Sequence, residues 1–285
     1  QKGGLALGRI GAERTEPIPV FAEMGSINPV VVLPSALDPS RGWATAYAQS
    51  VALGAGQFCT NPGLILGVAG EAWENFTTAL AIEIGKLPAA CMLHPGMAEA
   101  FRALRAEFLS QTGVRSIQGT GKEASGALVG GAVAGVSGED FRQNPLLQRE
   151  VFGPFTLTVA CKDKNELLEI IKGLEGQLTA SLLGEEAEIE AEPELLEALQ
   201  GRVGRLLFNG VPTGVEVCSS MHHGGPFPAT TDARFTSVGL DAFRRWVKPL
   251  ALQNAPATLL PDALRDENPL GIWRTVNGEW TRDSI

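Results

Sequence analysis

A cysteine in a glycine-rich turn is the residue of this sequence best suited to covalent chemistry. Cys59 lies in the segment GAGQFCTNPG at residues 54–63. Most free cysteines are small buried hydrophobic side chains, and the local sequence leaves that alternative open. In a polar turn where glycines bring the backbone close, a thiol is also able to act as a nucleophile, with backbone N–H groups holding the oxyanion it creates. Phe58, directly before it, either shapes a pocket beside the thiol or packs in the core.

Two carboxylates stand at the borders of apolar segments. Glu23 ends the segment PIPVFAE at 17–23, where a charge is costly unless it has a partner or a function. It is either a turn or helix-capping carboxylate or a general base that takes a proton from water. Glu150 precedes an apolar run in QREVFGP at 148–154, where the alternative is a turn with an incidental acid. None of these features decides a function alone.

Taken in order, Glu23, Cys59 and the EVFGP segment resemble the aldehyde dehydrogenase superfamily. In that family a glutamate in an E-[LM]-G-x-x-x-P setting precedes a nucleophilic cysteine in a G-Q-x-C loop, and here the two residues are 36 positions apart. The resemblance continues through LLFNG at 206–210 and covers nearly the whole chain. The segments GQFCTNPG, NGVPTGVEVCSSMHHGGPFPATTDARFTSVG and NPLGIWR are most similar to the 2-oxoglutarate semialdehyde (2,5-dioxovalerate) dehydrogenase branch, with fatty aldehyde dehydrogenases nearby.

The resemblance implies a reaction and a cofactor, NAD or NADP. A thiolate at Cys59 is expected to attack the aldehyde and give a thiohemiacetal, whose oxidation leaves a thioester. Glu23 is expected to activate the water that releases the carboxylic acid. Glu150 is expected to bind the ribose hydroxyls of the cofactor and Phe152 to lie beside the nicotinamide. The backbone N–H of Cys59 and an asparagine outside this chain are expected to hold the oxyanion.

The resemblance also bears on substrate and assembly. The expected substrate is a small-molecule aldehyde, most similar to 2-oxoglutarate semialdehyde, with Phe58 in its pocket. Its distal carboxylate needs a cation, for which Arg234 is the candidate. The adjacent His222 and His223 point in different directions in any regular element, so no metal site is expected; they line the substrate entrance or are purely structural. Family members form dimers and tetramers, so a homo-oligomer is expected.

Alternating strand and helix patterns surround these residues. This β–α alternation predicts an α/β fold with a mostly parallel sheet flanked by helices, here an aldehyde dehydrogenase-like catalytic domain with an extended C-terminal tail. Apolar runs predict strands at 17–22, 29–33, 63–70, 128–136, 155–162, 178–184 and 204–210, and periodic patterns predict helices from residue 3, at 41–53, 71–86, 97–112 and 164–174, and one ending near residue 200.

The resemblance suggests domain boundaries. Residues 1–34 are expected to be the end of a dinucleotide-binding domain whose remainder is absent, residues 35–245 the catalytic domain, and residues 246–285 a tail that packs on a neighbouring body. Family members carry the cofactor domain before the glutamate, whereas this sequence starts at QKGG. The isolated chain is therefore expected to have negligible dehydrogenase activity.

Composition excludes several classes of protein. A net charge of −9 and a pI near 5.0 argue against sequence-independent binding to nucleic acid or to an anionic membrane. The four cysteines form no CxxC pair, so free thiols in a reducing compartment are expected. The N-terminal sequence is unlike a signal peptide and no stretch has the length of a membrane span, which favours a cytoplasmic location.

Two other functions stay open at this point. A cysteine hydrolase or acyltransferase would use Cys59 with His222 or His223, although nothing in the sequence brings them together and Glu23 and the EVFGP segment go unexplained. A non-catalytic fragment whose role is oligomerisation is consistent with a missing cofactor domain. The reactivity of Cys59 toward iodoacetamide separates a chemical role from a structural one.

Overall fold

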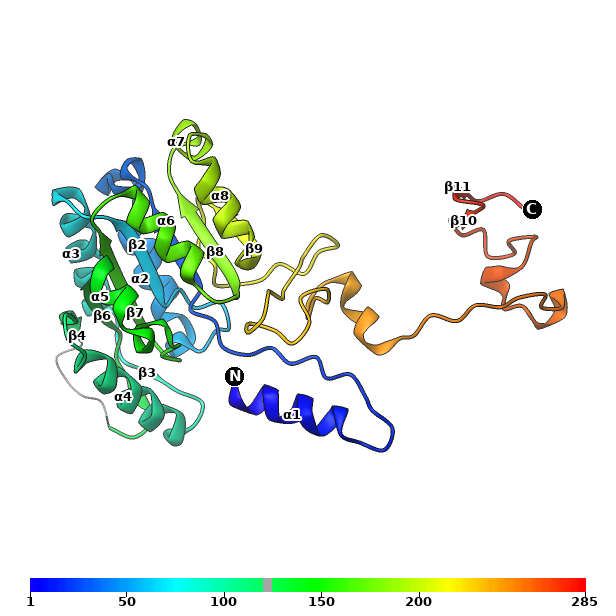
Figure 1. Ribbon diagram of the computed structural model, residues 1–285, viewed down its shortest axis with the longest axis horizontal. Coiled ribbons are helices and arrows are strands. Elements are labelled where there is room, and N and C mark those ends of the chain that lie inside the picture. The colour runs from blue at the N-terminus through cyan, green and yellow to red at the C-terminus, as the bar shows by residue number, and fades with distance from the viewer. Residues whose placement is uncertain (120–124) are drawn as a thin grey trace. The chain divides into compact units, whose positions relative to one another are not determined.

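A seven-stranded sheet carries the core of the larger part of the chain (Figure 1). The computed structural model describes residues 1–119 and 125–285. The strands lie in the order β4-β6-β7-β2-β1-β8-β9, and all neighbouring pairs are parallel except β4 and β6. Their bounds are β1 (Pro29–Val32), β2 (Leu64–Val68), β4 (Arg115–Gly119), β6 (Ala132–Ser137), β7 (Phe155–Cys161), β8 (Gln177–Leu183) and β9 (Val203–Phe208). The predicted mostly parallel α/β fold is confirmed.

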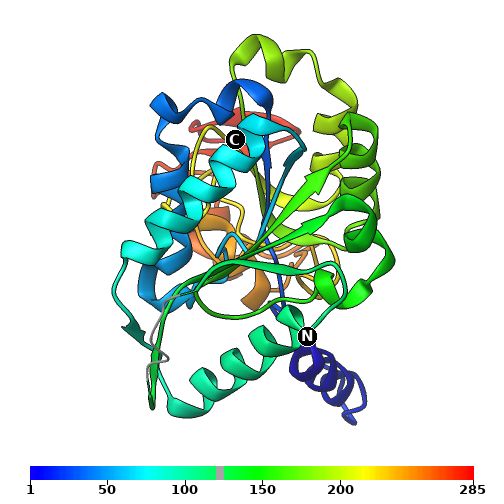
Figure 2. The same cartoon turned by 90° about the vertical axis from the view of Figure 1, so that its left-hand side faces the viewer.

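Helices cover both faces of this sheet (Figure 2). One face packs on α2 and α3 through a cluster that includes Tyr47, Val51 and Trp73, and the other carries a larger cluster that includes Phe101, Ile170 and the helices α4, α6 and α8. Because both faces are covered, the central strands β1 and β2 are apolar along their whole length. The helices are α1 (Lys2–Ala12), α2 (Trp43–Ala52), α3 (Glu71–Lys86), α4 (Pro95–Leu109), α5 (Gly138–Gln143), α6 (Lys164–Gly173), α7 (Glu186–Glu190) and α8 (Pro193–Gln200).

The remaining elements are short. Two-residue strands β3 (Ala90–Cys91) and β5 (Leu128–Val129) form an antiparallel pair. Short 3-10 helices occupy several turns: η1 (Pro34–Leu37), η2 (Pro39–Arg41), η3 (Leu53–Gly56), η4 (Pro145–Gln148), η5 (Leu240–Trp246), η6 (Ala257–Leu259) and η7 (Asp262–Leu264).

One predicted strand is wrong. Residues 17–22 were expected to form a strand, but they join no sheet in the described structure, and only Glu23 forms an isolated bridge, to Thr230. Two prolines in PIPVFA remove backbone donors that a ladder needs. The end of the segment instead pairs with a loop far along the chain: Thr231 donates its backbone N–H to the Ala22 carbonyl, and Met24 donates to Ala229. This pairing brings Glu23 beside the loop 221–237.

The parallel strands begin at one edge of the sheet, and this edge positions the site. Asn28 directly precedes β1, the Cys59 turn precedes β2, and the EVFGP segment precedes β7. Because β1, β2 and β7 are neighbours running in the same direction, the residues before them are neighbours too. We call this the amino edge of the sheet, and the opposite side, where the strands end, the carboxyl edge.

The chain separates into two compact units, residues 1–245 and 246–285. The second unit holds an antiparallel hairpin of β10 (Arg274–Val276) and β11 (Glu279–Thr281), with Asn268 hydrogen bonded to the backbone of Ile272 and Arg282. The domain boundaries suggested by the sequence, at residues 34 and 245, stay predictions. Among the described residues no helix has both the length and the apolar composition needed to cross a membrane.

Candidate active site

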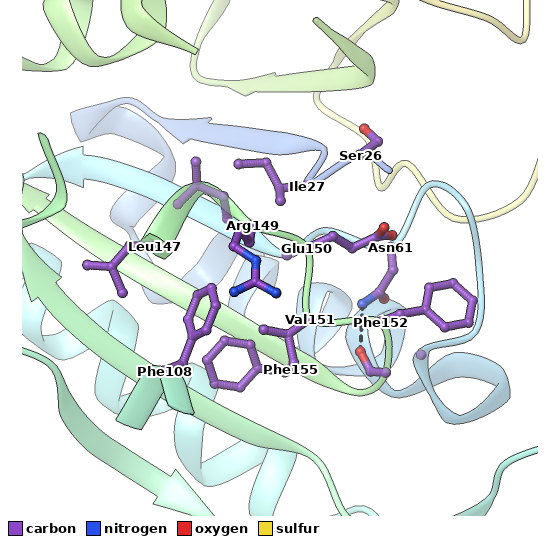
Figure 3. A pocket seen from close by; sticks show the side chains of 14 residues that line it. Ser26, Ile27, Asn61, Phe108, Leu147, Arg149, Glu150, Val151, Phe152 and Phe155 are labelled. Atoms are coloured by element: carbon purple, nitrogen blue, oxygen red, sulfur yellow. Dashed lines mark hydrogen bonds between the residues drawn. The ribbon is translucent and has the colours of Figure 1, made fainter. Parts of the chain in front are cut away.

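The Cys59 turn is built by left-handed backbone and a close approach to the EVFGP segment. Gly54, Ala55 and Gly56 all have positive φ, which reverses the chain after α2. A Cβ on Gly56 would lie 2.2 Å from the carbonyl carbon of Gly153. Glycine is therefore required where these two segments touch. Asn61 fastens the contact by donating a 3.1 Å hydrogen bond to the Gly153 carbonyl, the dashed line in Figure 3.

Asn28 is a buried residue whose side chain holds the turn that contains Cys59. Its amide nitrogen donates to the carbonyl oxygens of Cys59 and Asn61, each at 2.9 Å. Its own oxygen accepts hydrogen bonds from Ser26 and Thr179. Asn28 has a φ of 46°, a left-handed conformation that asparagine tolerates better than most residues. Fixing both carbonyls limits where the Cys59 side chain is able to lie.

Cys59, His223 and Glu23 come together at the amino edge. The Sγ of Cys59 lies 3.3 Å from the Nε2 of His223, and this nitrogen lies 3.2 Å from the Oε2 of Glu23. One ring nitrogen therefore faces both the thiol and the carboxylate. The His223 side chain is 5% exposed, whereas that of Glu23 is 30% exposed.

The loop 221–237 holds His223 through its backbone. The N–H of His223 donates to the Oγ1 of Thr236 at 2.8 Å, and its carbonyl accepts from the backbone N–H of Ser237 at 2.8 Å. The hydroxyl of Ser237 also donates to the Oε2 of Glu23 at 3.3 Å. The loop therefore fixes the histidine and the glutamate together.

The contacts among Cys59, His223 and Glu23 shift the pKa values of His223 and Glu23. Hydrogen bonds to Cys59 and then to Glu23 raise the pKa of His223 to about 9, because they favour the charged imidazolium. Burial acts to raise the pKa of Glu23, but the hydrogen bond and the charge of His223 outweigh it and lower that pKa. The Nδ1 of His223 has no hydrogen-bond partner within the described ranges.

Sequence reasoning gave His223 no role in the dehydrogenase mechanism; it was expected to line the substrate entrance or to be structural, and was an alternative partner of Cys59 in a hydrolase. The HH pair was visible, but 164 positions separate His223 from Cys59, and no local pattern joins them. The two histidines do behave differently: His222 packs beside Gly204 and Gly224, and burial lowers its pKa. Asn28, whose side chain holds the nucleophile turn, was also missed, although its place between Glu23 and a buried strand was a usable signal.

Glu150 and Phe152 line a narrow cavity that Asn61, from the turn containing Cys59, lines as well (Figure 3). This cavity runs between Asn61, Val151 and Phe155. A larger cavity of about 510 Å³ is lined by Gly25, Ser26 and Glu150 among others. Burial raises the pKa of Glu150 to about 7, and a Cβ on Gly25 would lie 3.1 Å from its Oε2. Gly25 thus lets the Glu150 carboxylate reach the backbone close to Glu23.

Two other predicted site residues lie farther from this chemistry. Phe58 folds its ring back over Gly54, where a Cβ would lie 2.8 Å from it. Arg234 is 82% exposed and paired with Asp232, so the structure does not bring it into the site. Arg245 instead lines a small cavity with Glu23 and His223. Of the other cysteines, Cys161 is buried in β7, Cys91 is exposed, and Cys218 is half-buried in a loop.

This geometry supports nucleophilic chemistry at sulfur. An imidazolium beside a sulfur stabilises the thiolate, which is the reactive form of cysteine. The Cys59 backbone N–H has no hydrogen-bond partner in the part of the chain that the structure describes, which leaves it available to an oxyanion. Against the opposing effect of burial, the hydrogen bond and the charge of His223 lower the pKa of the partly exposed Glu23. This favours the carboxylate form, which is able to accept a proton from water.

Comparison with known sequences places this chain in a protein family. The sequence profile described as "Aldehyde dehydrogenase family" matches residues 3–226. Alpha-ketoglutaric semialdehyde dehydrogenase 2 of Azospirillum brasilense is 45% identical over 282 residues, which are 98% of this chain and 53% of that protein. Alpha-ketoglutaric semialdehyde dehydrogenase of Acinetobacter baylyi is 42% identical over 291 residues, which are 99% of this chain and 54% of that protein. The chain spans about half the length of these curated relatives.

Solved structures share the fold at low sequence identity. Methylmalonate-semialdehyde dehydrogenase from Oceanimonas doudoroffii superposes with a TM-score of 0.71 at 17% identity, covering 87% of this chain and 51% of that one. Gamma-glutamyl-gamma-aminobutyraldehyde dehydrogenase from Burkholderia cenocepacia gives a TM-score of 0.69 at 18% identity, covering 86% and 48%. Glyceraldehyde-3-phosphate dehydrogenase from Methanocaldococcus jannaschii, solved with NADP, gives 0.65 at 19% identity, covering 79% and 48%.

Proposed function

The chain belongs to the aldehyde dehydrogenase family, and on that premise we propose that it is the catalytic part of an enzyme that oxidises 2-oxoglutarate semialdehyde to 2-oxoglutarate. The observation that carries the proposal is that Cys59, His223 and Glu23 lie together. The sulfur of Cys59, a ring nitrogen of His223 and a carboxylate oxygen of Glu23 all lie within 4.8 Å of one another. The names of the two curated relatives support this aldehyde as substrate.

We assign a step to each residue of this cluster. The thiolate of Cys59 attacks the aldehyde carbon, forming a thiohemiacetal whose oxygen is held by the Cys59 backbone N–H. Two-electron oxidation of this adduct leaves a thioester on the same sulfur. Glu23 then takes a proton from water, the water oxygen bonds to the thioester carbon, and the carbon–sulfur bond breaks to release the acid. His223 positions both the sulfur and the Glu23 carboxylate.

Bound NAD+ or NADP+ would supply the two-electron oxidation. The residues present fit such a group, because Glu150 offers a half-buried carboxylate on the wall of the 510 Å³ cavity, where burial has raised its pKa to about 7. Hydrogen bonds from ribose hydroxyls would satisfy that carboxylate. Phe152, which lines the adjoining narrow cavity, would limit water around the nicotinamide.

The distal carboxylate of the proposed substrate needs a cation, and two arginines are candidates. Arg234 stays the prediction from the sequence, but its exposure and its pairing with Asp232 make it the weaker one. Arg245 lines the cavity that Glu23 and His223 share. Replacing Arg245 by Gln is expected to raise KM for 2-oxoglutarate semialdehyde more than KM for an uncharged aldehyde, whereas Arg234→Gln serves as the comparison.

The proposal is tested with a protein in which this chain is joined to the part of the sequence that its relatives have in addition. The measurement is the steady-state reduction of NAD+ and NADP+. Wild type and Cys59→Ala are compared with 2-oxoglutarate semialdehyde and with simple aldehydes. Activity that prefers this aldehyde and disappears in the variant supports both the enzyme class and the substrate. Activity that survives in Cys59→Ala removes Cys59 as the nucleophile.

A second candidate reaction rests on the same 3.3 Å contact between Cys59 and His223. A Cys–His pair is sufficient for cofactor-independent acyl transfer, in which the thiolate displaces an alcohol from an ester and water then hydrolyses the thioester. The 285-residue chain with p-nitrophenyl acetate tests it directly. Release of nitrophenol that requires Cys59 supports this reaction, and a rate equal to that of Cys59→Ala excludes it.

We also propose that protomers of the whole protein pair. The strand β9 ends the sheet, so one side of its backbone is not covered by another strand of the described sheet, and Phe208 at its end is 51% exposed. Light scattering after gel filtration tests this: a monomer at micromolar concentration contradicts it.

A further inference from the structure

We propose that Glu23, Cys59 and His223 form a binding site for one Zn²⁺ ion, which blocks the nucleophile reversibly. Binding rests on the geometry of the three side chains alone, whereas the loss of reactivity also rests on the proposed role of Cys59. The sequence predicted no metal site, because it offered two adjacent histidines as the ligands. The structure supplies only one of them and completes the set with a thiol and a carboxylate.

The spacing of the three ligand atoms is close to that of a zinc site. Zinc binds sulfur at about 2.3 Å, imidazole nitrogen at about 2.0 Å and carboxylate oxygen at about 2.0–2.2 Å, so tetrahedral ligand atoms lie roughly 3.3–3.6 Å apart. In the structure, the Sγ of Cys59 is 3.3 Å and the Oε2 of Glu23 is 3.2 Å from the Nε2 of His223. All three atoms lie within 4.8 Å of one another. The third separation, between the Cys59 sulfur and the Glu23 carboxylate, is at most 4.8 Å, so it would close by up to about 1.2 Å to admit the ion.

The chemistry of the ligands selects zinc. A thiolate and an imidazole suit a borderline-soft ion, whereas Ca²⁺ and Mg²⁺ prefer an all-oxygen set. Binding places the metal on the thiolate and releases the thiol proton to solvent. The fourth position would take water from the small cavity that Glu23 and His223 line. A thiolate bound to zinc carries less negative charge on its sulfur and is therefore a weaker nucleophile toward an aldehyde.

Hydrogen bonds hold the backbone of two of the three ligand residues in place before an ion binds. Asn28 holds the carbonyl of Cys59, and Thr236 and Ser237 hold the backbone of His223. Little ordering entropy is therefore lost when an ion binds. A zinc-bound histidine usually donates its other N–H to a neighbour, but the Nδ1 of His223 has no partner in the described structure. We therefore expect affinity roughly 10- to 100-fold weaker than at a site with that outer hydrogen bond.

No other group of three such side chains among residues 1–119 and 125–285 brings its ligand atoms this close. Matched controls are therefore available within the same loops. His222 adjoins His223 but packs beside Gly204 and Gly224, and Cys218 is a half-buried thiol 3.5 Å from the hydroxyl of Ser220.

Titration of the 285-residue chain with Co²⁺, a spectroscopic substitute for zinc, tests the ligand set. We expect one Co²⁺ per chain, a thiolate-to-cobalt charge-transfer band, and displacement of the ion by Zn²⁺. Cys59→Ser should abolish the band, and His223→Gln and Glu23→Gln should each weaken binding at least about 100-fold. Cys218→Ser and His222→Gln should bind like wild type. No band in wild type, a band that persists in Cys59→Ser, or unchanged binding in Glu23→Gln would overturn the assignment.

Alkylation of the wild-type chain provides a measurement that needs no variant of buried His223. Iodoacetamide labelling of Cys59, read by peptide mass spectrometry, should slow at least tenfold in Zn²⁺ and recover in EDTA, while labelling of exposed Cys91 should not change. Equal protection of both cysteines, or none at Cys59, contradicts the proposal. Because neither experiment needs a cofactor or an aldehyde, failure of the zinc site leaves the dehydrogenase proposal untouched, and an inactive full-length enzyme leaves the zinc result readable.

Discussion

The two edges of the seven-stranded sheet differ in what they are built to do. Parallel α/β sheets usually bind ligands outside the carboxyl ends of their strands. Here the carboxyl edge has roomy cavities of about 350 and 710 Å³, lined by residues such as Val32, Lys164 and Lys162. Cys59, Glu23 and the buried Asn28 all lie at the amino edge instead. The amino edge also has a cavity of about 510 Å³, so cavities lie at both ends of the sheet, whereas the candidate catalytic side chains lie at one end.

Both edges have hydrogen bonds between their loops, such as those between Asn209 and Gly184 at the carboxyl edge. The difference lies in which side chains those bonds hold in place. At the amino edge, Asn28 bonds two carbonyls of the nucleophile turn, and Asn61 ties that turn to Gly153. At the carboxyl edge, the Lys164 side chain is mostly exposed and pairs with Glu192 at the surface. Function therefore has to be argued from side chains and their partners, because the fold alone points to the carboxyl edge.

The largest effect should come from removing the sulfur at the amino edge. Cys59→Ala is expected to lower kcat/KM for aldehyde oxidation in the full-length enzyme by at least about 10⁴-fold, because no other group is placed to form the covalent adduct. Steady-state kinetics measure this. A loss below about tenfold would mean that the amino edge does not hold the nucleophile, and the contrast between the edges would fail.

A methyl group at the contact between the two amino-edge loops should lower the free energy of unfolding. Gly56→Ala adds a Cβ that would lie 2.2 Å from the Gly153 carbonyl carbon, at a φ of 65°. Overpacking and backbone strain together should lower the free energy of unfolding by about 2–4 kcal/mol, measured in urea. Gly173→Ala at the end of α6 meets no atom within 4 Å and should be neutral or stabilising by up to about 1 kcal/mol. Equal effects would contradict the tight packing of this edge.

Glu150 should make the stability of the amino edge depend on pH. Burial raises its pKa from 4.5 to about 7, so the folded state holds its proton more tightly than the unfolded state does. This stabilisation is complete below pH 4.5 and is lost as pH rises through 7. Relative to wild type, Glu150→Gln should gain up to about 3 kcal/mol of unfolding free energy between pH 4.5 and 8. A difference that does not vary with pH would show that Glu150 is not buried as a carboxylate.

The smallest effect is expected at the carboxyl edge. Lys164→Ala removes an exposed ion pair with Glu192, which should change the free energy of unfolding by no more than about 0.5 kcal/mol and leave kcat/KM within twofold. Urea unfolding and steady-state kinetics check both values. A tenfold loss of activity would move part of the function to the carboxyl edge.

The sequence by itself determined the fold class and named Cys59 and Glu23 as candidate reactive residues. Strands such as β1 and β7 are visible as short apolar runs, because a strand enclosed on both sides must be apolar. Helix α3 was predicted with its observed bounds, 71–86. Cys59 and Glu23 stood out because a thiol in a glycine turn and a charge after an apolar segment conflict with simple burial. The signals for Cys59 and Glu23 cover ten residues or fewer, whereas the pattern of α3 covers 16 residues and the family resemblance depends on the order of several motifs along the chain.

Only the tertiary structure decided what surrounds the nucleophile. The failed strand at 17–22 pairs with a loop more than 200 positions away, and His223 reaches Cys59 across 164 positions. The tertiary structure also distinguished Arg234, which faces solvent, from Arg245, which lines the cavity beside Glu23. The physical reason is that spacing along the chain specifies turns and periodic elements, whereas contacts between distant loops are set by which strands lie side by side in the sheet.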